Sequence, residues 1–222
     1  METLWNQVDE YFHQRLDPPD RVLDEALGAS EEAGLPAISV TPSQGKLLQL
    51  LALIRGARRI LEVGTLGGYS AIWMGRALPS GGRLISLEIE ATNAEVARRN
   101  IARAGLSDRV DIWVAPAAAS LAKLTQDGVE PFDLIFIDAD KASNDAYFRS
   151  ALELSRAGTI IVVDNVVRKG DVIDGETDDA SVRGVRRLTD LLESERRVAA
   201  TAIQTVGSKG YDGFILAVVL EE

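Results

Sequence analysis

Short apolar runs alternate along the chain with stretches in which apolar residues recur at helical spacing. The runs rich in β-forming residues are residues 59–63, 84–87, 110–114, 134–137 and 159–163. Residues 91–104 show the helical pattern between two of these runs, with Val96, Ala97 and Ile101 on one face. Strands and helices that alternate with short connections form a parallel sheet with helices on both faces. The pattern therefore predicts an α/β fold.

The alternation ends after the fifth run. A loop rich in Gly and Asp spans residues 168–179, and a helix is expected over residues 181–193. Two further β runs, 198–206 and 214–220, are joined by a Gly-rich segment at 207–213. Because such a joint is typical of a hairpin, we expect the last strand to run antiparallel to its neighbours.

Residues 1–35 precede the alternating pattern and predict two short helices separated by Asp17-Pro-Pro-Asp20. This segment is acidic but carries apolar side chains, among them Leu4, Val8 and Phe12. We interpret it as a cover over the sheet or as the contact of a homodimer.

Length and composition predict one domain over residues 1–222, because this length and 46% hydrophobic residues suffice for a full core. No apolar run approaches the ~20 residues of a membrane span, and the N-terminus lacks a signal pattern. The chain has no cysteine, which excludes disulfides, thiolate zinc sites and a cysteine nucleophile. We therefore expect a cytoplasmic protein without a membrane partner.

The formal net charge of −10 is concentrated near the N-terminus. Nine acidic and two basic side chains give residues 1–40 a net charge of −7, which leaves −3 for the remainder. Nucleic-acid partners require a basic face, and the sequence offers none. We therefore expect no nucleic-acid partner.

Two apolar runs end abruptly in carboxylates, at Phe136-Ile-Asp-Ala-Asp-Lys141 and at Val162-Val-Asp-Asn165. Ligands bind at the carboxyl ends of the strands in open α/β sheets. There, Asp138, Asp164 and Asn165 would offer hard oxygen ligands to a divalent cation, with Lys141 placed to take a proton from a substrate oxygen. The alternative interpretation is that these carboxylates merely cap the helices that follow.

The residue types available decide which metal such a site would hold. The only histidine, His13, lies in the N-terminal segment, and cysteine is absent. A metal would therefore be bound by oxygen, which favours Mg²⁺, with Mn²⁺ or Ca²⁺ as alternatives, over zinc.

The first β run leads into a glycine-rich connection, Leu61-Glu-Val-Gly-Thr-Leu-Gly-Gly-Tyr-Ser70. Glycines let the backbone approach a ligand, and the N-terminus of the next helix offers N–H groups to an anion. The spacing is not G-x-G-x-x-G, so a plain tight turn remains the alternative. Glu88 ends the second run, 26 positions after Glu62. An acidic residue there typically accepts hydrogen bonds from ribose hydroxyls, which predicts an adenosine cofactor.

These motifs, together with Ala115-Pro-Ala117, resemble the cation-dependent O-methyltransferases in order and spacing over nearly the whole chain. That family includes caffeoyl-CoA and catechol O-methyltransferases and many bacterial relatives. The resemblance implies the class I, Rossmann-like methyltransferase fold, with a seven-stranded, mostly parallel sheet, helices on both faces and a C-terminal antiparallel hairpin. It also implies an enzyme that uses S-adenosylmethionine.

The resemblance further implies a role for each matching residue. The cofactor would be contacted by Val40, Thr41, Glu62, Gly64, Thr65, Ser70, Glu88, Ala117 and Asp140. The divalent cation would be bound by Asp138, Asp164 and Asn165. Lys141 matches the catalytic base, and Asp138 would act with it at the catalytic centre.

The acceptor is expected to be a small catechol or hydroxylated aromatic, because two vicinal oxygens can chelate one cation. The chain lacks the Trp–Asn pair that plant caffeoyl-CoA enzymes carry after the metal Asp-Asn, and reads Val166-Val-Arg-Lys-Gly170 instead. Its acidic N-terminal segment is a poor dock for coenzyme A phosphates, and its net charge argues against a tRNA substrate. Arg168 and Lys169 either meet an anionic acceptor or are simply solvated.

Two rival classes bind adenosine on a similar sheet. A nicotinamide-dependent oxidoreductase would require G-x-G-x-x-G and usually Tyr-x-x-x-Lys, and the sequence contains neither. A non-catalytic cofactor-binding module would have no need of Lys141 beside a full set of metal ligands.

Overall fold

The computed structural model of the chain describes residues 2–16 and 19–221. Its helices and 3-10 turns are α1 (Glu2–Leu16), α2 (Arg21–Glu32), α3 (Pro42–Arg55), α4 (Tyr69–Ala77), α5 (Ala91–Arg103), α6 (Ala117–Gln126), η1 (Lys141–Ser143), α7 (Asn144–Glu153), η2 (Arg168–Ile173) and α8 (Ala180–Ser194). Its strands are β1 (Arg59–Val63), β2 (Arg83–Glu88), β3 (Val110–Val114), β4 (Leu134–Ile137), β5 (Ile160–Asp164), β6 (Val198–Gly207) and β7 (Gly210–Val219).

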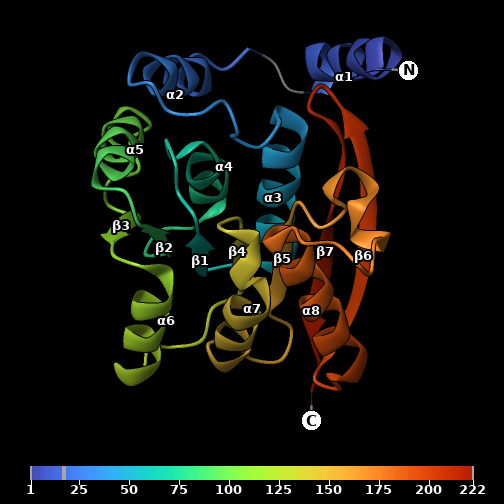
Figure 1. Cartoon of the computed structure of the whole chain (residues 1–222). Helices are drawn as coiled ribbons and strands as arrows, with labels where there is room; N and C mark the ends of the chain where they lie inside the picture. Colours follow the sequence, from blue (N-terminus) through green and yellow to red (C-terminus); the bar gives the residue numbers. More distant parts are fainter. Residues whose placement is uncertain (1, 17–18, 222) are drawn as a thin grey trace.

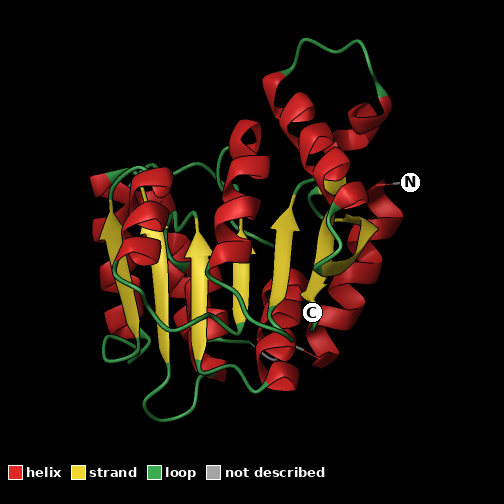
Figure 2. Cartoon of the chain, turned by 90° about the horizontal axis from the view of Figure 1, so that it is seen from below, coloured by secondary structure: helices red, strands yellow, loops and turns green. Residues whose placement is uncertain are grey.

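The strands form one seven-stranded sheet in the order β3-β2-β1-β4-β5-β7-β6. The first five strands are parallel, and β7 lies antiparallel between β5 and β6. Helices α3, α4 and α5 cover one face, and α6, α7 and α8 cover the other (Figure 1, and Figure 2 for the strands side by side). The predicted fold class, including the C-terminal hairpin, is confirmed.

The apolar strands are buried on both faces, because alternate residues serve two separate cores. On β4, Phe136 packs with the helices of the α3–α5 face, whereas Ile135 packs with those of the other face. On β1, Ile60 and Leu61 divide in the same way. Glu62 follows Ile60 by two positions and therefore points toward the α3–α5 face, although it is fully buried.

The hairpin differs from the sequence prediction in its turn. Gly207 pairs directly with Gly210, so only Ser208 and Lys209 form the connection, and β7 begins four residues earlier than the expected 214. Gly210 has a φ of +86°, a conformation that glycine adopts at little cost. The longer strand brings residues 210–213 to the carboxyl end of β5, where Asp164 pairs with Phe214.

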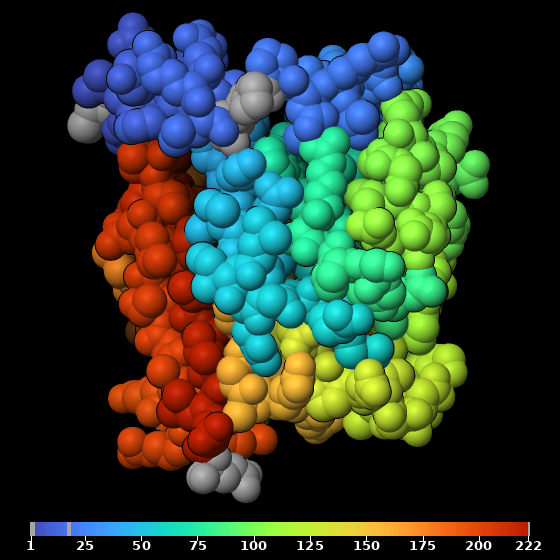
Figure 3. All heavy atoms as spheres, turned by 180° about the vertical axis from the view of Figure 1, so that it is seen from behind, coloured from blue at the N-terminus to red at the C-terminus, as the bar shows by residue number. Residues whose placement is uncertain are grey.

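The N-terminal helices α1 and α2 lie across one end of the molecule (Figure 3). Helix α2 contacts α4 and α5, and its N-cap Asp20 forms an ion pair with Arg76 of α4. Helix α1 contacts β6 and α3, and its Asp9 accepts a hydrogen bond from the backbone N–H of Ser208. Residues 17 and 18 of the expected Asp17-Pro-Pro-Asp20 separator lie outside the described residues. The homodimer stays a prediction.

No helix in the described part of the chain is long and apolar enough to cross a membrane.

Asp133 fixes the amino ends of the central strands. Its side chain is 2% exposed and accepts hydrogen bonds from the backbone N–H groups of Arg58 and Arg59 at 2.8 and 3.0 Å. It also forms ion pairs with Arg156 and Arg55. These hydrogen bonds and the Arg156 charge outweigh burial and lower the pKa of the Asp133 carboxyl below 3.8.

Asp133→Ala should lower the free energy of unfolding by about 3 kcal/mol at pH 7, because buried backbone donors lose their acceptor. A carboxyl with a lowered pKa stabilises the fold above its unfolded-state pKa, and this contribution is lost as pH falls through the folded-state value. Denaturant titrations should therefore show the deficit shrinking below about pH 4. Asp127→Ala, which breaks only an exposed ion pair with Lys123, should cost within about 0.5 kcal/mol. A pH-independent deficit would contradict the assignment.

Candidate active site

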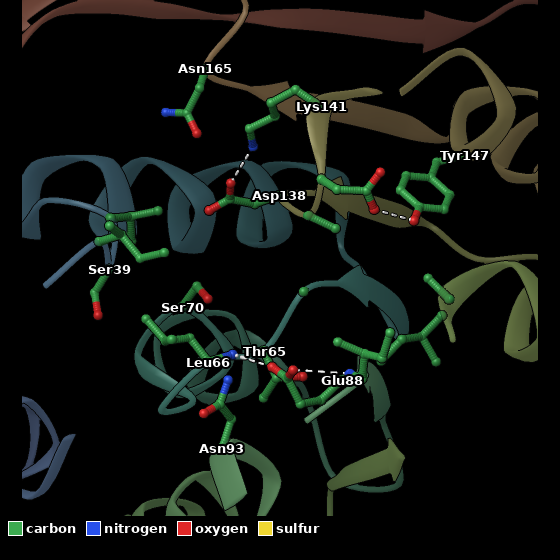
Figure 4. Close-up of a pocket in the computed structure, with 18 of the residues that line it drawn as sticks. Ser39, Thr65, Leu66, Ser70, Glu88, Asn93, Asp138, Lys141, Tyr147 and Asn165 are labelled. Atoms are coloured by element: carbon green, nitrogen blue, oxygen red, sulfur yellow. Dashed lines mark hydrogen bonds and ion pairs between the residues drawn. The ribbon is translucent and has the colours of Figure 1, made fainter. Parts of the chain in front are cut away.

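A cavity of about 720 Å³ opens at the carboxyl ends of β1 and β4. These strands are neighbours in the sheet, although β2 and β3 intervene in the sequence, so connections leave them in opposite directions. That arrangement leaves a crevice at the sheet edge, where ligands bind in open α/β folds. In Figure 4, Asp138, Lys141 and Asn165 lie at one end of the cavity, and Leu66, Glu88 and Asn93 lie at the other.

The cavity brings together most of the residues singled out in the sequence. Those that line it are Val40, Gly64, Thr65, Ser70, Glu88, Ala117, Asp138, Asp140, Lys141 and Asn165. Three others do not line it: Thr41, Glu62 and Asp164. Thr41 is the N-cap of α3, where its Oγ1 accepts a hydrogen bond from the backbone N–H of Gln44.

The glycine-rich connection places the backbone against the neighbouring strand. Gly64 has a φ of +100°, and a Cβ at this position would lie 2.1 Å from the carbonyl oxygen of Asp138. Gly68, also with positive φ, precedes α4 without a side-chain cap, so the first N–H groups of α4 have no capping acceptor. Tyr69 and Ser70 at this helix start line the cavity, which suits an anionic group of a ligand.

Glu62 supports Ser70 from behind the cavity. Ser70 Oγ and Ser86 Oγ donate hydrogen bonds to the two oxygens of the Glu62 carboxyl, each at 2.5 Å. Ser86 is the register partner of Glu62 on β2. Complete burial raises the pKa of Glu62 to about 7, against the opposing effect of both serines. We conclude that Glu62 orients Ser70 and that the structure does not place it against a ligand.

Glu88 ends β2 with its carboxylate held by backbone donors. Its Oε2 accepts from the N–H of Leu66 at 2.7 Å, and its Oε1 accepts from the N–H groups of Ile89 and Glu90 at 2.9 Å (Figure 4). The carboxylate is 7% exposed and lines the cavity. Since a carboxylate oxygen has about two acceptor sites, the two backbone donors fill Oε1, and Oε2 keeps one site for a ligand hydroxyl.

Lys141 lies in η1, directly after the carboxylates that follow β4. Its Nζ is 2.6 Å from Asp138 Oδ1, and the residue is 8% exposed. Asp164 at the end of β5 is 4% exposed. Its burial and the repulsion of the Asp138 carboxylate raise the pKa of Asp164 to about 7, against the attraction of Lys141. The buried Asp164 and Lys141 therefore lie close to the partly exposed Asp138 carboxylate.

This site fits a hard divalent cation by its donor chemistry. Asp138 and Asp164 repel each other, and a dication between them would relieve the repulsion. Asn165, with a φ of +56°, adds an amide beside them. The described residues contain no group of three or more His, Cys, Asp or Glu side chains that could hold a metal, so the candidate set has only two carboxylates. Magnesium typically takes one or two carboxylates and completes its shell with other oxygens.

Tyr147 and Lys209 are among the residues near the site that the sequence analysis did not single out. Tyr147 of α7 donates a hydrogen bond from its hydroxyl to Asp140 Oδ1, and burial together with that bond raises its pKa to about 12. Tyr147 thus stays a donor at neutral pH and orients Asp140. The sequence signal for this contact was its position seven residues after Asp140, a distance of about two helical turns. Burial lowers the pKa of Lys209 in the hairpin turn, against the attraction of the Asp138 and Asp164 carboxylates.

The sequence profile of the O-methyltransferase family matches residues 19–218. The chain belongs to this family. A catechol O-methyltransferase from Niastella koreensis is 50% identical over 216 residues, which cover 97% of this chain and 98% of that protein. The structure of an O-methyltransferase from Bacillus cereus in complex with SAH matches with a TM-score of 0.97 at 55% identity, covering 99% of this chain and 100% of that one. The structure of the O-methyltransferase TomG from Streptomyces achromogenes in complex with SAM matches with a TM-score of 0.96 at 49% identity, covering 99% of each chain.

This O-methyltransferase is thus an S-adenosylmethionine-dependent enzyme, as the family match and the full-length similarity to such enzymes show. The resemblance drawn from the strand-end motifs is confirmed. The nicotinamide-dependent oxidoreductase and the non-catalytic module are excluded.

Glu62→Gln should change how the stability of the O-methyltransferase depends on pH. The folded wild type retains a proton that the unfolded chain releases, so its stability falls as pH rises from 4.5 toward 7. The variant lacks this loss, and its free energy of unfolding relative to wild type should rise by up to about 3 kcal/mol over that range. Denaturant titrations from pH 5 to pH 8 measure it. For the control Glu130→Gln, at an exposed carboxylate, the free energy of unfolding should depend on pH as in the wild type. If the pH dependence of Glu62→Gln also runs parallel to that of the wild type, Glu62 does not hold a buried proton.

Proposed function

We propose that this O-methyltransferase methylates one hydroxyl of a small catechol, with Lys141 as the base and with Asp138, Asp164 and Asn165 binding a divalent cation. The observation that carries the proposal is the 2.6 Å contact of Lys141 Nζ with Asp138 Oδ1 at the mouth of a cavity, next to the buried Asp164. The similar protein from Niastella koreensis, a catechol O-methyltransferase, supports the acceptor class.

The reaction forms an oxygen–methyl bond on the acceptor and breaks the sulfur–methyl bond of the cofactor, which leaves as S-adenosylhomocysteine. A neutral phenol, with a pKa near ~10, is a poor nucleophile. Lys141, in its neutral form, takes the hydroxyl proton at Nζ. A bound Mg²⁺, or Mn²⁺ or Ca²⁺ in its place, would act as a Lewis acid and fix the orientation of the two vicinal oxygens.

The other cavity residues bind and orient the cofactor. Glu88 accepts hydrogen bonds from the ribose hydroxyls, and Ala117 contacts the adenine. Ser70, held by Glu62 at the N-terminus of α4, binds the cofactor carboxylate. This role gives Glu62 a positioning function in place of the direct contact expected from the sequence.

Four further residues of the expected cofactor set belong to the same proposed binding site. Val40, Gly64 and Thr65 line the cavity beside the methionine end of the cofactor, and Asp140 lies alongside it, held by Tyr147. Holding both substrates in line supplies much of the rate enhancement, since reacting atoms no longer have to meet by diffusion.

Methyl transfer to catechol should require Mg²⁺ or Mn²⁺, because oxygen ligands converge beside Lys141. Mass spectrometry should detect methylated catechol with Mg²⁺, and chelation should abolish the product reversibly. Asp164→Ala should lose turnover, while S-adenosylhomocysteine binding, measured by calorimetry, largely survives. Full activity on catechol after exhaustive chelation would overturn the metal assignment, and absence of product with every divalent ion would overturn the acceptor class.

Lys141→Ala should lower the rate of catechol methylation at neutral pH by about 10²–10⁴-fold, the usual worth of a positioned base. The loss should shrink for nitrocatechol, because its more acidic hydroxyl requires less proton removal. Lys123→Ala, at an exposed lysine of α6, serves as the matched control and should leave both rates unchanged. Equal losses with both acceptors would assign Lys141 to positioning or charge and not to proton removal.

A further inference from the structure

Arg168 is a charged residue that lines the cavity and to which the proposed reaction gives no role. It follows Asn165 by three residues, begins η2 and lines the cavity. Its Nε is buried and has no hydrogen-bond partner among the described residues. Leaving a buried donor of a charged group unsatisfied is costly, so such a group in a cavity wall indicates a ligand that completes it.

The backbone of Arg168 is fixed by Asp212 of β7. A single oxygen, Asp212 Oδ1, accepts hydrogen bonds from the N–H groups of Val167 and Arg168 at 3.0 Å and of Gly213 at 2.9 Å. Arg168 has a φ of +55°, which is uncommon for a residue with a side chain. Strain of this kind persists where surrounding contacts impose it, often at ligand sites. The loop therefore fixes the backbone of Arg168 beside the cavity that its side chain lines.

The acidic groups around Arg168 are engaged elsewhere. Asp212 uses its Oδ1 for backbone donors, as described. Asp179, on which the Arg168 charge acts, is the N-cap of α8 and accepts hydrogen bonds from the N–H groups of Ser181 and Val182. The Nε–H of Arg168 thus stays available to a ligand.

The neighbouring Lys169 provides an internal comparison. It also has a positive φ, of +59°, but it is exposed and does not line the cavity. The sequence left open whether both cations meet an anionic acceptor or are solvated. The structure separates them, with Arg168 at the cavity and Lys169 in solvent.

We propose that Arg168 binds a carboxylate on the aromatic acceptor, so that the preferred acceptors are catechols bearing a carboxylate. This inference rests on the proposed function and deepens it. A guanidinium matches a carboxylate with two parallel N–H donors, which gives both energy and orientation. Arg168 lines the cavity and follows Asn165 by three residues, and Asn165 lies at the end of the cavity opposite Glu88, which is the acceptor end of the proposed site (Figure 4). The other source of a carboxylate is the methionine part of the cofactor, and the experiment separates the two.

Calorimetry should compare 3,4-dihydroxybenzoate with its uncharged amide, 3,4-dihydroxybenzamide, in Mg²⁺ buffer with S-adenosylhomocysteine present. Both ligands offer the same catechol, so their affinity ratio isolates the carboxylate. We expect wild type to bind the acid at least tenfold more tightly than the amide. Arg168→Gln should reduce that ratio at least tenfold, Arg168→Lys should retain part of it, and the matched control Lys169→Gln should retain all of it.

Asp212→Ala distinguishes a held guanidinium from a diffuse charge effect. Removing a negative charge would by itself strengthen binding of the acid, whereas releasing the Arg168 backbone should weaken it. We expect weaker binding of the acid by Asp212→Ala. Tighter binding would overturn the role of Asp212.

A wild-type ratio near one would overturn the proposal. So would an Arg168→Gln variant that binds S-adenosylhomocysteine more weakly but keeps the acid preference, because Arg168 would then serve the cofactor carboxylate. Turnover of unsubstituted catechol is measured separately. An enzyme that binds the acid through Arg168 but methylates no catechol would refute the proposed function and leave the anion site standing.

Discussion

The close approach of two glycines to the segment after β4 is the constraint on which the active site depends. A Cβ at Gly64 would lie 2.1 Å from the carbonyl oxygen of Asp138, and a Cβ at Gly184 of α8 would lie 2.1 Å from that of Lys141. No side-chain movement can relieve contacts with backbone atoms. The segment that carries Asp138 and Lys141 is therefore fixed on one side by the connection that follows β1 and on the other by α8, which holds Lys141 beside Asp138.

Two carboxyl groups near this segment, those of Asp164 and Glu62, are buried. Asp164 is nearly inaccessible and close to Asp138, so the fold concentrates negative charge where a dication and Lys141 can neutralise it. Glu62 is buried deeper still, but both its oxygens are satisfied by serines. In the proposed function, one buried carboxyl binds the cation, and the other holds Ser70 in the wall of the cavity. Burial alone would not distinguish Asp164 from Glu62, but their hydrogen-bond and charge partners do.

The sequence identified the residues that follow strand ends. Asp138, Asp164 and Asn165 were found because an apolar run that stops in carboxylates is a local signal, and parallel strands bring such ends to one edge. Glu62 was found as well, but it does not line the cavity; its side chain points toward Ser70 of α4, behind the cavity wall. That direction depends on which face α4 covers, and no local pattern states it.

The sequence by itself determined the fold class, the family and the edge of the sheet that carries the chemistry, because periodicity and strand-end motifs are encoded within short windows. Only the tertiary structure placed Arg168 at the cavity and Lys169 in solvent, although both are adjacent cations with positive φ. This placement depends on Asp212, 44 residues later, which reaches Arg168 because β7 begins at Gly210 and runs antiparallel beside β5. Contacts between segments so far apart in sequence follow from strand register and turn length, and the chain fixes these only when it packs.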